Sequence, residues 1–281
     1  MSAVIVVAVD GPAGSGKSSV SKAVASKRGF AYYDTGAAYR ALAWAAVKAG
    51  VDLESEEAVL TVQQSARYEA SQDPSRQEFF VDGTDVTEAI RGVEVSDTVS
   101  QIARHPRVRE GLVAHFRDVL SSCDKPGIVM EGRDITTVVA PDATVRVLLT
   151  ASEEVRIARR QAELSGGMAQ PVAESLKARD RSDQSVVDFM NAAPGVSVID
   201  SGPLTFDESV EAMLSLIDET VGGLFACGDH EDLARAVNHC LDHPDERTEQ
   251  MRRGRQRVLD RFTYEHNAEA YERIYASLLE E

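Results

Sequence analysis

A glycine-rich segment near the start of the chain carries the clearest chemical pattern. Gly11, Gly16, Lys17 and Ser18 match GxxxxGK[ST] in full. Glycines let backbone N–H groups curve around an anion, and a following helix adds the positive end of its dipole. A lysine at this spacing neutralises the β- and γ-phosphates of a nucleoside triphosphate, and the serine hydroxyl binds Mg²⁺. The residues predicted to bind ATP are Gly11, Pro12, Ala13, Gly14, Ser15, Gly16, Lys17, Ser18 and Ser19, with Ser18 as the metal ligand.

This loop does not say what receives the phosphate. GTPases carry DxxG and NKxD elements as well, and we find neither here. A kinase acting on a small phosphorylated acceptor needs a second anion site, for which arginine is suited because its planar fork grips phosphate oxygens bidentately. Arginines that follow predicted strands or lie on a predicted flap are the candidates: Arg40, Arg109, Arg133 and Arg179.

The elements that must position these residues follow an α/β order. Apolar, β-branched runs flanked by turn residues predict buried parallel strands, and helical spacing of apolar residues predicts the helices between them. The predicted strands are Val4–Val9, Phe30–Tyr33, Gly127–Glu131, Thr144–Leu149 and Val196–Ile199. The predicted helices include Ser19–Lys27, Ala37–Lys48 and Phe206–Thr220.

Two segments interrupt this order. Strand patterns at Ala66–Ser71 and Gln77–Val81, followed by an Asp82-Gly83 turn and a short third strand, predict a small antiparallel insertion. The stretch Gln101–Leu120 is predicted to be helical, with an interruption near Pro106. Residues 151–185 are charged and helical, Ser152 is a predicted N-cap, and Ser165-Gly166-Gly167 breaks the pattern, which is suited to a mobile flap.

Residues 3–218 carry five motifs in the same order as in the bacterial cytidylate (CMP/dCMP) kinase family, which this part of the chain resembles. They are GPAGSGKSS, DTGAAYRALA, the IRG to REGL segment, EGRDITTVV with PDA, and ARDRSD. The resemblance implies a P-loop nucleoside monophosphate kinase fold: a parallel five-stranded sheet flanked by helices. It also implies a partly β acceptor-binding insertion at about 62–105 and a helical lid at about 151–185. ATP with Mg²⁺ is the expected donor system, and CMP and dCMP are the expected acceptors.

The same resemblance implies roles for individual residues. It places Arg40 and Arg133 on the acceptor phosphate, and it places Thr35, Ser100, Arg109 and Asp134 around cytosine. It brings Arg179 and Asp183 to the acceptor sugar. The expected catalytic residues are Lys17, Arg133, Arg179 and Arg181.

Two positions depart from the family pattern. A lid arginine is expected three residues after Asp183, where this chain has Val186, so either Arg181 substitutes or turnover is reduced. The family's GRDxGT becomes Gly132-Arg-Asp-Ile-Thr136-Thr137, which loses a glycine that allows close backbone approach. We expect the activity to persist with altered kinetics.

Charge and composition exclude several partners. A formal net charge of −16 disfavours nucleic acids and anionic membranes as partners of the whole surface. The sequence has no run of 18 apolar residues, so it predicts no membrane-spanning helix. The three cysteines, Cys123, Cys227 and Cys240, form no CxxC pair, which fits a reducing cytoplasm. A monomer is expected, with a cationic cleft for nucleotides inside an acidic body.

Residues 221–281 differ from the rest of the chain, since they hold eight arginines and no lysine. We therefore predict a boundary near residue 220. Residues 223–281 resemble the C-terminal end of GT-B glycosyltransferases, whose nucleotide-sugar residues lie upstream of the segment kept here. Amphipathic helices that pack on the kinase or on another protein are favoured over sugar transfer, and a fused junction near Val221 is the other explanation.

Two alternative functions remain open at this stage. One is a different small-molecule P-loop kinase, and the other is a nucleotide-binding interaction protein with weak catalysis.

Overall fold

The computed structural model describes residues 4–163, 189–221 and 230–255, apart from 246, 249, 250 and 253. The chain divides into two compact units, residues 1–214 and 215–281. The first unit carries the sheet and its insertion, and the second carries the acidic tail.

A five-stranded parallel sheet forms the centre of the first unit, in the strand order β2-β6-β1-β7-β8. All four neighbouring pairs are parallel. Every residue of β6 is buried, as expected for a strand covered on both faces. The strands are β1 (Ile5–Asp10), β2 (Ala31–Asp34), β6 (Gly127–Gly132), β7 (Val145–Thr150) and β8 (Ser197–Asp200), which confirms the five predicted strands to within a residue or so.

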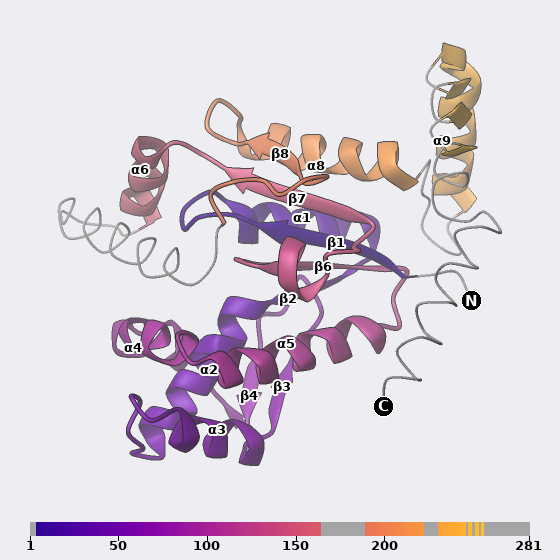
Figure 1. Ribbon diagram of the computed structural model, residues 1–281. Coiled ribbons are helices and arrows are strands. Elements are labelled where there is room, and N and C mark those ends of the chain that lie inside the picture. Colours follow the sequence, from indigo (N-terminus) through magenta and orange to yellow (C-terminus); the bar gives the residue numbers. More distant parts are fainter. Residues whose placement is uncertain are drawn as a thin grey trace. The chain divides into compact units, whose positions relative to one another are not determined.

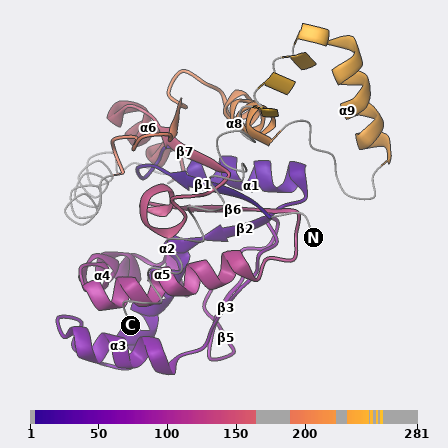
Figure 2. The same ribbon diagram turned by 45° about the vertical axis from the view of Figure 1, so that its right-hand side comes forward.

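Helices follow the strands where the sequence predicts them. Helix α1 (Lys17–Arg28) follows β1 and ends at Gly29, which adopts the left-handed conformation typical of a helix end. Helix α2 (Thr35–Lys48) buries an alanine-rich face, and helix α8 (Phe206–Val221) closes the predicted order. In both views α2 and α5 (Pro106–Ser121) lie on the same side of the sheet (Figure 1, Figure 2).

The insertion contains the predicted antiparallel sheet. Its strands β3 (Tyr68–Ala70), β4 (Phe79–Val81) and β5 (Thr84–Asp85) pair in that order. Asp82 and Gly83 both have positive φ, 50° and 73°, as a two-residue hairpin turn requires. The predicted hairpin is therefore confirmed.

The helical part of the insertion differs from the prediction. Helix α3 (Glu56–Ser65) precedes β3, a short η1 turn (Ala89–Arg91) follows β5, and helix α4 (Val93–Ala103) begins well before the predicted Gln101. The interruption predicted near Pro106 is confirmed, because α4 ends at Ala103 and Pro106 begins α5. Proline lacks the N–H that a helix interior needs but is tolerated in the first turn.

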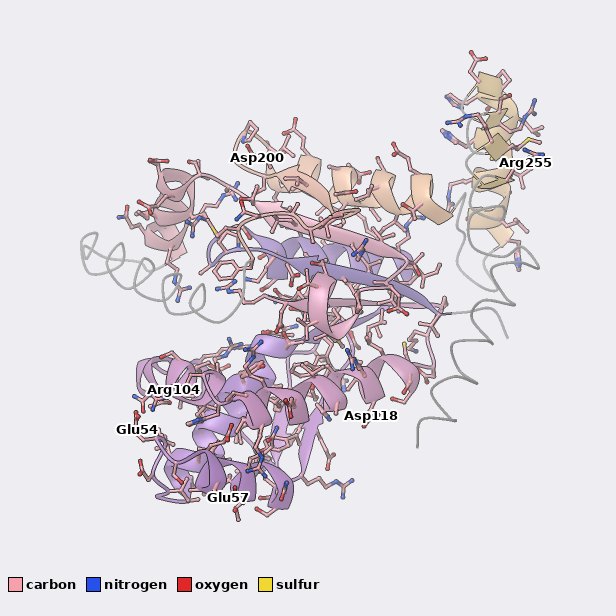
Figure 3. All side chains as sticks on the ribbon, viewed as in Figure 1. Glu54, Glu57, Arg104, Asp118, Asp200 and Arg255 are labelled. Carbon is pink, nitrogen blue, oxygen red and sulfur yellow. The ribbon has the colours of Figure 1, made fainter. Side chains whose placement is uncertain are left out.

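Ion pairs connect α3 and the turn before it with the end of α4 and with α5. Arg104, at the end of α4, pairs with Glu54 ahead of α3, and Figure 3 shows the two side chains beside each other. Arg107 of α5 pairs with Glu57 of α3 at 2.7 Å. These exposed pairs add little stability each, so the insertion depends mainly on its buried apolar residues.

Two further elements lie near the ends of the central strands. The segment η2 (Ile135–Val139) follows β6, and helix α6 (Glu153–Glu163) follows β7. Ser152 accepts a hydrogen bond from the Val155 N–H at 3.4 Å, as predicted for an N-cap. Residues 164–185 of the predicted lid lie outside the described residues.

The described part of the tail is helical. Helix α9 (His230–Asp242) exposes Leu233, Val237 and Leu241 along one face, which is consistent with the predicted amphipathic character. The end of the tail, residues 256–281, lies outside the described residues. Among the residues that are described, no helix combines the length and apolar character that a membrane crossing needs.

Candidate active site

The predicted phosphate loop connects β1 to α1. A Cβ atom on Gly11 would come within 2.1 Å of the Leu149 carbonyl oxygen, so only glycine fits there. Gly16 precedes α1 with φ 86°, a left-handed conformation that favours glycine. The loop therefore delivers its backbone to the N-terminus of α1, where N–H groups and the helix dipole attract anions. All nine predicted ATP-binding residues, Gly11 to Ser19, lie in this loop or the first turn of α1.

Side chains that were not among the predicted site residues hold the phosphate loop through its carbonyl oxygens. Arg156 of α6 donates to the Ala13 carbonyl oxygen at 3.0 Å. Arg159 donates to the Ser15 carbonyl oxygen at 3.4 Å, and the Ser201 hydroxyl donates to the same oxygen at 2.9 Å. Only the charged character of the flap hinted at these arginines, because their partners lie more than 140 residues earlier in the chain.

A buried carboxylate faces the loop lysine. Glu131, at the end of β6, is 1% exposed, and its Oε2 lies 3.9 Å from Lys17 Nζ. Its Oε1 accepts a hydrogen bond from the Tyr32 hydroxyl at 2.7 Å. Burial, together with the charges of Glu131 and Asp34, raises the pKa of Tyr32, so that this hydroxyl stays protonated and donates. Neither Glu131 nor Tyr32 was among the predicted site residues, although Glu131 opens the EGRD motif.

Asp34 and Arg40 form an ion pair at the start of α2, with 2.9 Å between Oδ2 and Nη2. Asp34 also caps the helix by accepting from the Ala37 N–H at 2.9 Å. Burial acts to raise the pKa of Asp34, but Arg40, the Ala37 N–H and Lys17 outweigh it and hold the pKa below its ordinary value. The predicted phosphate ligand Arg40 is thus oriented by a charged partner.

The hydroxyl of Thr35 is directed at the sheet. It donates to the Glu131 backbone carbonyl oxygen at 2.8 Å, and the residue is buried. In the structure this hydroxyl therefore connects α2 to β6. The predicted role of Thr35 at the base stays a prediction.

Arg109 and Asp134, both predicted around the base, lie together. Arg109 Nη2 is 3.5 Å from Asp134 Oδ2. Burial raises the pKa of Asp134, and Arg109 opposes that shift. Ser100 lies on α4 with a half-buried side chain, and no bond from it to this pair is among the described contacts.

Arg133 connects the segment after β6 to the phosphate loop. Its Nη1 donates to the Gly11 carbonyl oxygen, and its guanidinium carbon lies 4.6 Å from the centre of the Phe189 ring. Close by, the Thr136 hydroxyl donates to Asp10 Oδ2 at 2.6 Å. At the position where a family glycine was expected, this chain therefore has a side-chain hydrogen bond to Asp10.

The remaining predicted residues lie in the segment 164–188, outside the described residues. They are Arg179, Arg181, Asp183 and Val186. Their predicted roles at the acceptor sugar and the transferring phosphate stay predictions.

The glycine loop between a buried parallel strand and a helix, with arginines from neighbouring strand ends, defines a P-loop α/β phosphotransferase. Residues 7–219 match the family model described as cytidylate kinase. The chain belongs to the cytidylate kinase family.

Curated relatives named cytidylate kinase match this chain over almost their whole length. The cytidylate kinase of Cutibacterium acnes is 44% identical over 220 residues, which cover 77% of this chain and 97% of that protein. Those of Streptomyces avermitilis and Geobacillus kaustophilus are 41% and 40% identical, covering 76% and 78% of this chain and 93% and 98% of theirs.

A second family model, described as glycosyl transferase-like, matches residues 202–273. This match partly supports the resemblance of residues 223–281 to a glycosyltransferase tail. It begins inside the region that the cytidylate kinase model also covers.

Proposed function

We propose that this chain transfers the γ-phosphoryl group of ATP to CMP and dCMP, giving CDP and dCDP, within residues 1–220. The observation that carries the proposal is the match to cytidylate kinases over nearly their full length. The phosphate loop, with arginines from α2 and the segment after β6 at its side, agrees with it.

The phosphoryl transfer needs positioning and charge compensation more than proton transfer. Lys17 would neutralise charge on the β- and γ-phosphates, while the loop N–H groups hold the phosphate oxygens. Arg133 donates to the Gly11 carbonyl oxygen of the loop, which supports its proposed role on the acceptor phosphate next to the donor. Arg40, oriented by Asp34, would grip the same acceptor phosphate.

Arg109 and Asp134 form the proposed base site. A cytosine presents an amino donor beside a ring nitrogen and a carbonyl acceptor, which suits a carboxylate and a guanidinium held together. Ser100 and Thr35 complete the proposed set, and Arg179 and Asp183 would reach the sugar from the lid. Arg181 is proposed to compensate for the missing lid arginine at Val186.

The donor set fits a Mg²⁺ ion. Ser18 offers a hydroxyl at the start of α1, and Glu131 offers a buried carboxylate beside Lys17. Oxygen ligands of these two kinds are what Mg²⁺ accepts alongside phosphates and water. When bound, the ion would neutralise charge on the transferring phosphate.

A coupled ADP-release assay across CMP, dCMP, UMP, AMP and GMP tests the proposal. We expect CMP and dCMP to give the highest kcat/KM, and preference for AMP or GMP would favour a different small-molecule kinase. ATP binding without CMP-stimulated turnover would instead favour an interaction protein.

Lys17→Ala is expected to reduce CMP-stimulated turnover by a factor of about 10²–10³, since it removes the cation at the transferring phosphate. Lys27→Ala is the matched control, because Lys27 is exposed near the opposite end of α1 and pairs with Glu211. A residual activity of Lys17→Ala close to that of Lys27→Ala would contradict the role of the loop lysine.

We further propose a cytoplasmic monomer that binds nucleotides and neither nucleic acid nor membrane. The tail is proposed to be a helical appendage that contacts a protein and has no sugar-transfer activity.

A further inference from the structure

Asp10 is a buried carboxylate that receives three hydrogen bonds from one short segment. Its Oδ1 accepts from the Ile135 N–H at 2.8 Å, and its Oδ2 accepts from the Thr136 N–H at 2.8 Å and the Thr136 hydroxyl at 2.6 Å. Asp10 is 3% exposed. Burial raises the pKa of this carboxyl, and the bonds from Thr136 and Ile135 act against that shift.

The hydrogen bonds of Asp10 lie between the phosphate loop and the segment that follows β6. Asp10 ends β1 and is followed directly by Gly11, the first residue of the phosphate loop. The residues that donate hydrogen bonds to Asp10, Ile135 and Thr136, begin η2 and come directly after Arg133 and Asp134. A single carboxylate therefore joins the loop proposed to hold the donor to the residues proposed to hold the acceptor.

The three donors differ in what they require of the sequence. Two are backbone N–H groups, which any residue other than proline supplies at 135 and 136. The third is a side-chain hydroxyl, so it depends on Thr136 alone. Thr136 is also buried, so water cannot readily replace its hydroxyl at Asp10.

We propose that Thr136 is a positioning residue whose hydroxyl, through Asp10, fixes Arg133 and Asp134 relative to the phosphate loop. This inference rests on the proposed function. In-line transfer depends steeply on the distance and angle between acceptor and donor, and a shift of about 1 Å can cost about 10²-fold in rate. The hydroxyl acts on that geometry and not on ATP binding, which the loop performs by itself.

The test compares Thr136→Val, which keeps the shape and removes the hydroxyl, with Thr136→Ser, which keeps the hydroxyl. Thr137→Val is the matched control, because the neighbouring Thr137 is exposed. Steady-state kcat and the KM values for ATP and CMP are measured on the full-length chain. Circular dichroism at the assay temperature checks that each variant is folded.

For Thr136→Val we expect kcat to fall by about 10- to 100-fold, with KM for ATP within about twofold of the wild type. Thr136→Ser and Thr137→Val should stay within about threefold of wild-type kcat. If Thr136→Val fails to fold, the smaller Thr136→Ala is judged by the same criteria.

Three results would overturn the inference. The first is a Thr136→Val enzyme that is less stable but has wild-type kcat, since this marks a purely structural contact. The second is an equal loss of kcat in Thr136→Ser, and the third is a rise in KM for ATP that accounts for the whole effect. Absence of CMP-stimulated turnover in the wild-type chain would instead overturn the proposed function, and this inference with it.

Discussion

Two neighbouring tyrosines on β2 allow the strength of the Glu131 contact to be measured. Tyr32 and Tyr33 are each 3% exposed, and each hydroxyl has a partner. Tyr32 bonds the Glu131 carboxylate at 2.7 Å, whereas Tyr33 bonds His115 Nε2 at 3.0 Å. Burial lowers the pKa of His115, so its ring is neutral at pH 7.

Tyr→Phe substitution removes one hydroxyl and keeps the ring, so neither variant opens a cavity of any size. A hydrogen bond to a charged group contributes about 1.5–3 kcal/mol, and one between neutral groups contributes about 0.5–1.5 kcal/mol. We therefore expect Tyr32→Phe to lower the free energy of unfolding by about 1.5–3 kcal/mol, and Tyr33→Phe by about 0.5–1.5 kcal/mol.

Equilibrium urea unfolding at pH 7 measures both losses. The single tryptophan, Trp44 on α2, reports the unfolding of the kinase unit alone, because the tail contains none. The two variants should share the wild-type m-value, so that the midpoints compare directly. Equal losses, or a larger loss for Tyr33→Phe, would refute the idea that Glu131 is held by a charge-assisted bond.

Two further predictions concern pH and the tail. Because the folded pKa of Asp34 lies below its ordinary value of 3.8, its contribution to stability is complete above that pH and is lost as the pH falls through the folded pKa. Asp34→Asn should therefore flatten the acid limb of the stability curve measured by urea unfolding from about pH 5 down to about pH 2, whereas Asp118→Asn, at an exposed site on α5 (Figure 3), should not. A chain ending at residue 221 should keep wild-type kcat for CMP, since the relatives match over about that length, and a loss beyond about tenfold would assign the tail a part in catalysis.

Sequence patterns were enough to predict the elements whose own residues determine their structure. Strands β1, β6 and β7 are apolar runs rich in β-branched residues and largely buried, and the Asp82-Gly83 hairpin depends only on its own turn. Helices α3 and α4 were harder to predict because they pack mainly on α2 and α5, which are separate elements of the chain. Their boundaries reflect tertiary packing more than local preference.

The candidate site shows a similar division. The phosphate loop is contiguous in sequence, so its pattern identified it completely. The contacts of Glu131 with Tyr32, and of Arg156 with Ala13, join residues 99 and 143 positions apart. Such contacts depend on which strands are neighbours and in which register, and no local pattern specifies either.

The position of β1 at the centre of the sheet also affects how the chain is made. Ile5 pairs with Gly127 and Val7 with Val145, so both partners of the first strand emerge from the ribosome well over 100 residues later. At about 5–20 residues per second, β1 spends about 6–25 s without either neighbour. During that time an apolar strand with open edges must be kept from other chains. Nascent-chain chaperones are therefore expected to engage residues 4–10 until β6 has been synthesised.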